Sequence, residues 1–312
     1  MTGCIRRFGG TLVAALGVGG ALAIANRWLL LDDLPPTLPG ATHEWMWRGQ
    51  RVRYTTLGSG PPMVLLHGIH AAASSFEMRQ VFEPLSHTYT VYALDWLGFG
   101  KSERPAIRYG GHLYASLLAD FLREVVQAPC TVVASSLSGA YAIAAARAQP
   151  SCIDRLMLLS PTFQTRLGVG GQVAGWLLTL PLIGTAAFNL LVSHASIQSY
   201  ARKAYADPAF VDETLVGQQW ATAHQPNARL APAAFVASAF DLPVGGLPKL
   251  TLPILVVRGS VPGIGAAATD AELRDLSTDV TIKTIPDTGQ LPHDESPDEL
   301  LDLLARWNAP PR

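Results

Sequence analysis

The stretch Thr131-Val-Val-Ala-Ser-Ser-Leu-Ser-Gly-Ala140 joins a β-branched apolar run to a run of small residues with helical character. It predicts a buried strand that turns sharply into a helix, with Ser136 at the bend. Small residues two positions before and after this serine, Ala134 and Ser138, let the strand and the helix approach closely. Such a turn presents the Ser136 hydroxyl as a nucleophile, whereas in an ordinary strand-to-helix turn Ser136 would only cap the helix.

Strand-like and helix-like segments alternate on both sides of this turn. Short apolar runs end at His67, Leu94 and Leu159, with helical spacing between them. The alternation stops over residues 163–249, which have helical and loop character, and resumes with two further strand-like runs. The pattern predicts an α/β fold: a mostly parallel central sheet with helices on both faces, and a helical cap inserted before the penultimate strand.

Composition narrows the class of protein. The chain has 312 residues, of which 49% are hydrophobic and 15% charged, and this favours one large globular domain. With 23 basic and 24 acidic residues there is no overall field to attract nucleic acid, so we predict no nucleic-acid partner. Cys4, Cys130 and Cys152 lack the spacing of metal ligands, and we predict neither a metal nor another cofactor.

The first 31 residues differ from the rest of the chain. Arg6 and Arg7 precede an uncharged stretch that runs from Phe8 to Asn26. Its length is close to the roughly 20 apolar residues of a membrane-spanning helix, and arginines before it fit a cytoplasmic amino end. We therefore predict that residues 1–31 form a hydrophobic anchor or signal, and that the protein associates with a membrane through them.

Two alternatives to an anchor stay open. Ala23-Ile24-Ala25 fits the small-residue cleavage site of a secretory signal, which would leave a secreted or periplasmic protein. The other alternative is a helix packed against the domain. Residues 32–41 are rich in proline and are predicted to be a linker, so that the main domain spans residues 42–312 with its cap at about 163–249.

Two more motifs follow predicted strands. His67-Gly68-Ile69-His70 comes after one strand, and Asp95-Trp-Leu-Gly-Phe-Gly-Lys-Ser102 comes after the next. In this order, with the Ser136 turn after them, the chain resembles the α/β-hydrolase family over residues 51–162. The part from residue 252 onward is similar as well, and the middle resembles the helical cap of that family.

The resemblance implies roles for particular residues. Ser136 would attack the acyl carbon, and the backbone amides of Leu137 and Ile69 would hold the oxyanion. The side chains at those two positions matter little, because both donors are backbone groups. His67 and the Asp95 loop are expected to be structural. His70 is expected near the mouth of the pocket, either as a loop histidine with its hydrogen bonds satisfied or as a catalytic one.

The resemblance weakens at the base and the acid. The family usually has a histidine in the turn after the last strand, but in Ile285-Pro-Asp-Thr-Gly-Gln-Leu-Pro-His-Asp-Glu295 this position is Gln290. Glutamine cannot take a proton near neutral pH, so His293, three residues later, is the candidate base. The loop Val257-Arg-Gly-Ser-Val-Pro-Gly263 has no carboxylate, and Asp270 is expected to cap a helix, so no acid is assigned.

These residues lead to three functional hypotheses. The first is a serine hydrolase acting on an ester or other acyl bond of a lipophilic small molecule, since the cap is rich in leucine, valine and tryptophan. Pro292-His-Asp-Glu-Ser-Pro297 is also similar to a stretch in the branch that includes chlorophyll and pheophytin dephytylases. The second is a non-catalytic ligand-binding protein on a hydrolase scaffold with a degenerate triad. The third is cofactor-free lyase or oxygenase chemistry, which the fold also supports.

Overall fold

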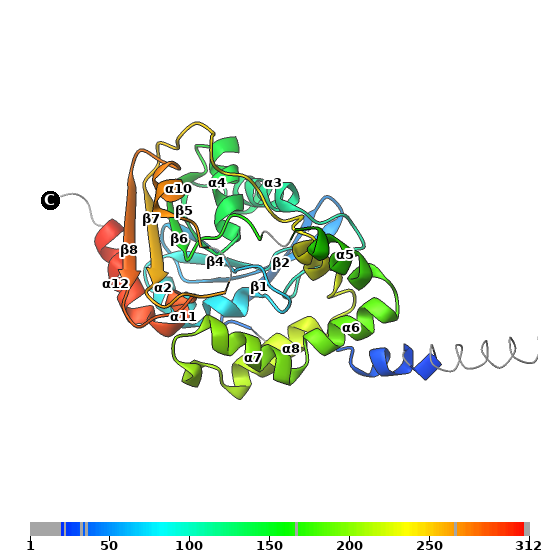
Figure 1. Cartoon of the computed structure of the whole chain (residues 1–312). Helices are drawn as coiled ribbons and strands as arrows, with labels where there is room; N and C mark the ends of the chain where they lie inside the picture. The colour runs from blue at the N-terminus through cyan, green and yellow to red at the C-terminus, as the bar shows by residue number, and fades with distance from the viewer. Residues whose placement is uncertain are drawn as a thin grey trace, which may run out of the picture.

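The structure is a computed structural model that describes residues 20–21, 23–31, 34, 37–165, 168–264 and 267–308. Within them, the strands form one sheet in the order β1-β2-β4-β3-β5-β6-β7-β8 (Figure 1). The strands are β1 (Ala41–Trp47), β2 (Gln50–Leu57), β3 (Pro62–Leu66), β4 (Thr90–Leu94), β5 (Cys130–Ser135), β6 (Ile153–Leu159), β7 (Ile254–Gly259) and β8 (Val280–Ile285).

Helices connect the strands and fill the insertion. The helices of the main domain are η1 (Ser75–Met78), α2 (Arg79–Ser86), α3 (Gly111–Phe121), η2 (Leu122–Val126), α4 (Ser138–Ala148), α10 (Asp270–Arg274), α11 (Pro292–Glu295) and α12 (Pro297–Asn308). Those between β6 and β7 are α5 (Gly168–Thr179), α6 (Ile183–Leu191), α7 (His194–Ala204), η3 (Pro208–Phe210), α8 (Glu213–Ala223) and α9 (Leu230–Val236).

The sheet is parallel from β4 through β3, β5, β6 and β7 to β8, and only β1 and β2 are antiparallel. The predicted fold class is therefore confirmed, including a helical insertion before the penultimate strand. The sequence pattern missed β1, which pairs with β2 along its whole length. Most of its side chains are exposed, so it lacks the apolar run that indicates a buried strand.

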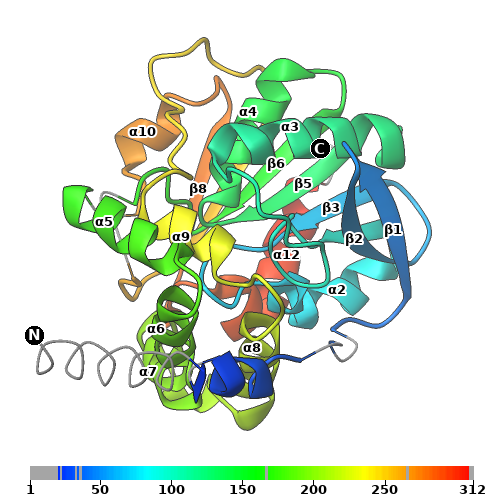
Figure 2. The same cartoon turned by 90° about the vertical axis from the view of Figure 1, so that its right-hand side faces the viewer.

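Two apolar layers hold helices against the two faces of the sheet. Val132 belongs to the layer beneath α3 and α4, whereas its neighbour Val133 belongs to the layer above α2 and α12. Successive residues of a strand point to opposite faces, so a central parallel strand must be apolar at every position. Figure 2 shows α3 and α4 on one side of the strands and α2 and α12 on the other.

Two short helical segments differ from regular helices. The segment after β3 begins with the 3₁₀ turn η1 and becomes α-helical only at Arg79. The helix near Asp270 is only α10, which has five residues. Thr269, not Asp270, is its cap: the Thr269 hydroxyl accepts from the Glu272 amide, and the Glu272 carboxylate accepts from the Thr269 amide.

The cap helices α5 to α9 have an apolar cluster of their own and lie beside the sheet (Figure 1). Residues 23–28 are helical and lie against α6. There the Asn26 side chain donates to the Leu182 carbonyl at 3.2 Å and accepts from the Asn189 side chain at 3.1 Å. The Leu31 amide donates to the His224 carbonyl at 2.9 Å, so this segment is joined to the cap at both ends.

The predicted membrane anchor falls mainly on residues 1–19, which lie outside the described residues. Among the described residues, no single helix combines the length and the apolar character needed to cross a membrane. Helices α5 and α6 meet that test only as a pair, and they are bent by 114° where they join.

Candidate active site

Ser136 occupies the sharp turn between β5 and α4. Its φ of 52° lies in the left-handed region, which is uncommon for a serine and costs of order 1 kcal/mol or more. The turn is held on both sides, because the Ser136 amide donates to the Leu159 carbonyl at 2.9 Å and the Ser136 carbonyl accepts from the Gly139 amide at 3.1 Å. A strained serine fixed in this way matches the geometry of a nucleophile elbow.

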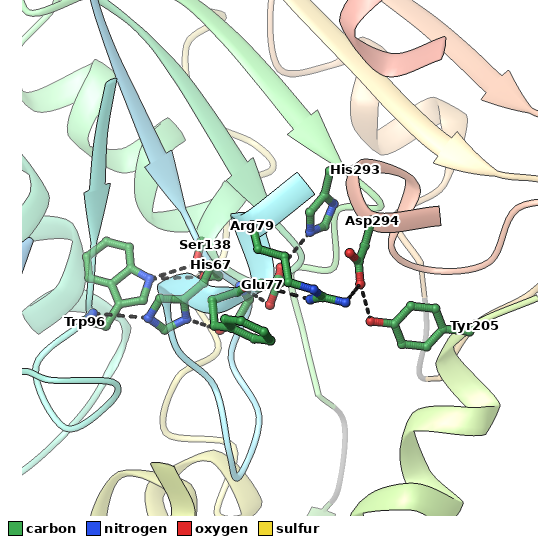
Figure 3. Close-up of polar contacts among 10 residues, drawn as sticks. His67, Glu77, Arg79, Trp96, Ser138, Tyr205, His293 and Asp294 are labelled. Atoms are coloured by element: carbon green, nitrogen blue, oxygen red, sulfur yellow. Dashed lines mark hydrogen bonds and ion pairs between the residues drawn. The ribbon is translucent and has the colours of Figure 1, made fainter. Parts of the chain in front are cut away.

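The loop that follows β3 is tied directly to this turn. The Ser138 hydroxyl donates to the His67 carbonyl at 2.5 Å and accepts from the Trp96 indole at 2.9 Å (Figure 3). The His67 ring accepts from the Trp96 amide at 3.2 Å, and the Asp95 carboxylate accepts from the Ser75 amide at 2.7 Å. These groups are buried and position the loops, and Ser138 contributes a hydroxyl bridge as well as a small side chain.

Ser136 borders a cavity of about 240 Å³ between the sheet and the cap. The two expected oxyanion donors, Ile69 and Leu137, lie in its wall, and so does Gln290. The other lining residues are Gly68, His70, Glu77, Ser135, Thr162, Gln164, Thr165, Tyr200, Ala201, Ala204, Tyr205, Gln219, Phe235, Ile264 and Leu291. The fold thus brings together residues of three separate segments that the sequence singled out, the loop after His67, the Ser136 turn and the turn at Gln290.

The backbone amides around the serine differ in whether they already donate a hydrogen bond. The Gly68 amide donates to the Glu77 carboxylate at 3.0 Å. Within the described part of the chain, the amides of Ile69 and Leu137 donate to no protein acceptor. Two unoccupied N–H groups beside a serine are what an oxyanion hole requires.

Glu77 is a charged residue that lies beside Ser136 and the Gly68 amide, and no sequence motif indicated it. A Cβ placed on Gly68 would lie 3.2 Å from Glu77 Oε2 and 3.5 Å from Ser136 Cβ, so the carboxylate and the serine border the same small space. Its other oxygen, Oε1, lies 3.3 Å from His293 Nε2. This is a close polar contact rather than a well-directed hydrogen bond, because neither atom has a hydrogen-bond partner among the described residues.

The surroundings of Glu77 keep it ionised. Burial by itself would raise its pKa, but the contact with His293 and the nearby His70 and His67 outweigh burial and lower the pKa to about 2. The cavity wall therefore carries a negative charge beside Ser136 at neutral pH.

His293 lies behind Glu77 rather than in the cavity wall. It is on α11, its side chain is fully buried, and it is absent from the lining. The next residue, Asp294, accepts from Arg79 at 2.6 Å and from the Tyr205 hydroxyl at 2.5 Å (Figure 3). In the described residues, no side chain forms a hydrogen bond with the Ser136 hydroxyl.

Gln290 takes the position where the family resemblance implies the base. Its side-chain oxygen accepts from the Ile264 backbone amide at 2.9 Å, and its backbone amide donates to the Ala204 carbonyl at 2.7 Å. Gln290 thus joins the loop after β7 to the end of α7. The amide group is held in place, but it has no basic atom to offer the serine.

His70 is the histidine that lines the cavity. Its Nδ1 accepts from the Ala72 amide at 3.3 Å, so its remaining nitrogen carries the proton in the neutral ring. Burial is the main influence on it and lowers its pKa below 6.5, although Glu77 acts in the opposite direction. His70 is therefore neutral near pH 7.

Sequence reasoning missed Glu77 and the cap residues Tyr200, Tyr205 and Gln219. No motif marks them, because they reach the cavity only through the packing of the cap and of η1 on the sheet. Among the described residues, no group of three or more His, Cys, Asp or Glu side chains is arranged to hold a metal ion.

Comparison with known families agrees with this geometry. Residues 63–303 match the model of the Alpha/beta hydrolase family. The chain belongs to this family. An uncharacterized protein of Mycobacterium tuberculosis is 36% identical over 129 residues, and the match covers 41% of this chain but only 36% of that relative's length.

Two other matches extend over most of the chain. The 2-(acetamidomethylene)succinate hydrolase of Mesorhizobium japonicum is 24% identical over 269 residues, covering 80% of this chain and 88% of that protein. Among solved structures, the epoxide hydrolase CorEH without ligand has a TM-score of 0.72 at 22% identity and covers 87% of this chain and 99% of its own. At that identity, the structural likeness shows the fold alone.

Proposed function

We propose that this chain is a serine hydrolase that uses Ser136 to attack an ester or other acyl bond of an uncharged, lipophilic small molecule. The observation that carries the proposal is the strained Ser136 turn, which opens into a cavity beside two unoccupied amides. The Ser136 oxygen would bond to the acyl carbon, and the carbonyl oxygen would become an oxyanion held by the Ile69 and Leu137 amides. Loss of the leaving group would give an acyl-serine, which water then hydrolyses.

The charge of the cavity supports an uncharged substrate. Glu77 is ionised there, and none of the described lining residues is lysine or arginine. A substrate carboxylate would be repelled and would have no cationic partner. In this respect the chain differs from relatives whose names specify acids, such as 2-(acetamidomethylene)succinate hydrolase.

The proton acceptor has two candidates. His293 contacts Glu77, so a shift of the turn at residues 289–292 would bring its imidazole toward the serine. His70 already lines the cavity and is neutral near pH 7. We propose His293 as the base and keep His70 as its rival, because catalytic hydrogen bonds often form only once substrate is bound.

A second function is favoured by Gln290. Its side-chain oxygen is held by the Ile264 amide at the place of the usual base, so the cavity also suits a protein that binds a lipophilic ligand without turning it over. An oxyanion hole without a base still leaves about 10³-fold acceleration over water, so slow acylation and ligand binding are compatible.

The location in the cell belongs to the proposal. The uncharged run from Phe8 to Asn26 supports attachment to a membrane through the amino-terminal segment, with cleavage to a secreted or periplasmic form as the alternative.

A fluorophosphonate probe tests the nucleophile. We expect covalent labelling of the wild type at Ser136, found by peptide mass spectrometry, and loss of labelling to background in Ser136→Ala. Ser135→Ala is the matched control, because Ser135 is the neighbouring hydroxyl and lines the same cavity. Wild type that stays unlabelled while a control esterase reacts would leave ligand binding as the function.

The same assay separates the two bases. Removal of the working base slows labelling by about 10²-fold or more, whereas removal of the other histidine leaves the rate nearly unchanged. Circular dichroism checks that His70→Ala and His293→Ala are folded, and His293→Gln serves as the milder change at the buried site. Equal rates in all these variants would exclude both histidines.

A further inference from the structure

Large apolar side chains are exposed together on one side of the cap. They belong to α5, α6 and the segment 23–30, helical up to Trp28, which both views place on the same side of the molecule (Figures 1 and 2). The most exposed are Trp28 at 84%, Val169 at 75%, Leu190 at 74%, Ile183 at 65% and Trp176 at 61%. Others on the same elements are Ile24, Leu29, Leu30, Val173, Leu177, Leu182 and Leu191. We call this surface the apolar cap face.

The chemistry of the apolar cap face is unusual for a surface in water. Residues 168–193 contain no charged side chain and no histidine. Most of the large apolar side chains that are exposed anywhere in the described residues lie on this face. Contiguous exposed apolar patches of this kind mark an interaction site for another protein or for a membrane.

The helices are too short to cross a bilayer but have the right form to lie on one. Helices α5 and α6 have 12 and 9 residues, against the roughly 20 that a span needs. They are bent by 114° at their junction, so neither continues the other. Their inner sides pack on the cap: Gly175 of α5 has no room for a side chain against Ala233 and Ala237. Helices with one packed and one apolar outer side suit the membrane interface.

The amino-terminal segment points to the occupant. The uncharged run that begins at Phe8 leads directly into this face, and Asn26 is hydrogen-bonded to Leu182 and Asn189 at its edge. Tryptophan is enriched at membrane interfaces, where its amphipathic ring sits at the headgroup level, and Trp28 and Trp176 are both exposed here. Lipid is therefore a better match than a protein surface.

We propose that the apolar cap face lies in the surface of a phospholipid bilayer, with the exposed sides of α5, α6 and residues 24–30 in the headgroup and upper acyl region. The binding is driven by apolar burial, so neutral phosphatidylcholine suffices and salt has little effect. Helix α5 packs on α9, which carries the cavity-lining Phe235, so the membrane lies one helix away from the cavity. If the proposed function holds, a lipophilic substrate reaches the cavity from the lipid phase.

The test uses the full chain with a fluorophore on a single cysteine. Val173→Cys and Leu190→Cys place the label on the apolar cap face. Met46→Cys places it on β1, which is on the opposite side in Figure 2, at a residue whose side chain is 55% exposed. Cys4 and Cys152 are replaced by serine in all three proteins, and Cys130 is kept because its buried thiol does not take the label. The vesicles are phosphatidylcholine containing a spin-labelled phosphatidylcholine, which quenches only a fluorophore within the bilayer surface.

Labels at 173 and 190 are expected to lose about half or more of their emission on vesicles, at both low and high salt, while the label at 46 keeps its emission. Adding Leu190→Glu to the Val173→Cys protein should reverse much of its quenching, whereas Glu83→Gln should not. Vesicle-bound protein with unquenched labels at 173 and 190 would overturn the proposal. So would a lipid-free dimer, seen by sedimentation, that shields both labels, because the occupant is then a second copy. Neither readout depends on Ser136.

Discussion

The two sides of the candidate active site are built in opposite ways. On the nucleophile side, Ser136 and the unoccupied amides of Ile69 and Leu137 are placed by backbone geometry and face the cavity. On the base side, the loop after β8 has Gln290 in the cavity wall, while His293 and Asp294 are turned into the protein and fully buried.

This comparison shows that the residues after β8 join the cap to the main domain, and we call this set of contacts the joint. Asp294 on α11 binds Arg79 of α2 and Tyr205 at the end of α7, so it fastens the cap to the main domain. Glu295 adds to this, accepting from the Ala206 amide at 2.7 Å and the Gly289 amide at 2.9 Å. Asp294 and Glu295 are therefore committed to joining the cap to the main domain rather than to the serine.

The largest effect is expected from breaking this joint. Arg79→Met keeps apolar contact with Phe76 but leaves the Asp294 carboxylate, 1% exposed, without its cation. Removing one partner of a buried ion pair costs about 3–5 kcal/mol, so we expect a loss of that size in the free energy of urea unfolding. Arg306→Met is the control, since its pair with Asp302 is 77% and 71% exposed and should change stability by less than about 1 kcal/mol. Equal effects would show that the joint contributes little.

Placing a histidine at position 290 would give the Gln290 side of the cavity a proton acceptor. Gln290→His puts an imidazole in the cavity wall, and we expect fluorophosphonate labelling of Ser136 to accelerate by about 10²-fold. This is the lower end of the range for a positioned base, because the 260–263 loop has no carboxylate to orient the ring. Gln219→His is the matched control, since it adds the same ring to the cap side of the same cavity. An unchanged rate in Gln290→His would place the serine out of reach of this position.

The smallest effect concerns the Glu77 charge that links the two sides. Its pKa is about 2 in the folded chain against an ordinary 4.5, so the stability it contributes is fully present well above pH 4.5 and is lost as pH falls toward 2. Between about pH 6 and pH 3.5, wild type should therefore lose roughly 1 kcal/mol more unfolding free energy than Glu77→Gln. Urea unfolding at the two pH values measures this.

Glu83→Gln is the control for that experiment, because Glu83 lies on α2 but is exposed. It should show the same pH dependence as wild type. A Glu77→Gln protein that loses as much stability as wild type would mean that the Glu77 pKa is near its ordinary value.

Local patterns in the sequence were sufficient for the fold and for one side of the site. The β-branched run before Ser136 and the small residues after it predicted the elbow, because a buried strand and a close-packed helix each have their own residue spacing. The roles proposed for the amides of Ile69 and Leu137 came from the resemblance to the α/β-hydrolase family, and both residues line the cavity. Strand β1 escaped this reasoning, since an exposed edge strand carries no apolar signal.

Only the tertiary structure decided what the other side of the site does. Arg79 and Asp294 are 215 residues apart in the chain, and the Glu77–His293 contact is of similar span, so no local spacing encodes either one. Whether a histidine faces a serine or a carboxylate depends on how a short helix packs against distant loops. The sequence therefore determined the sharp turn at Ser136 through short-range backbone preferences, whereas the charge of the cavity and the burial of His293 were decided by long-range side-chain packing.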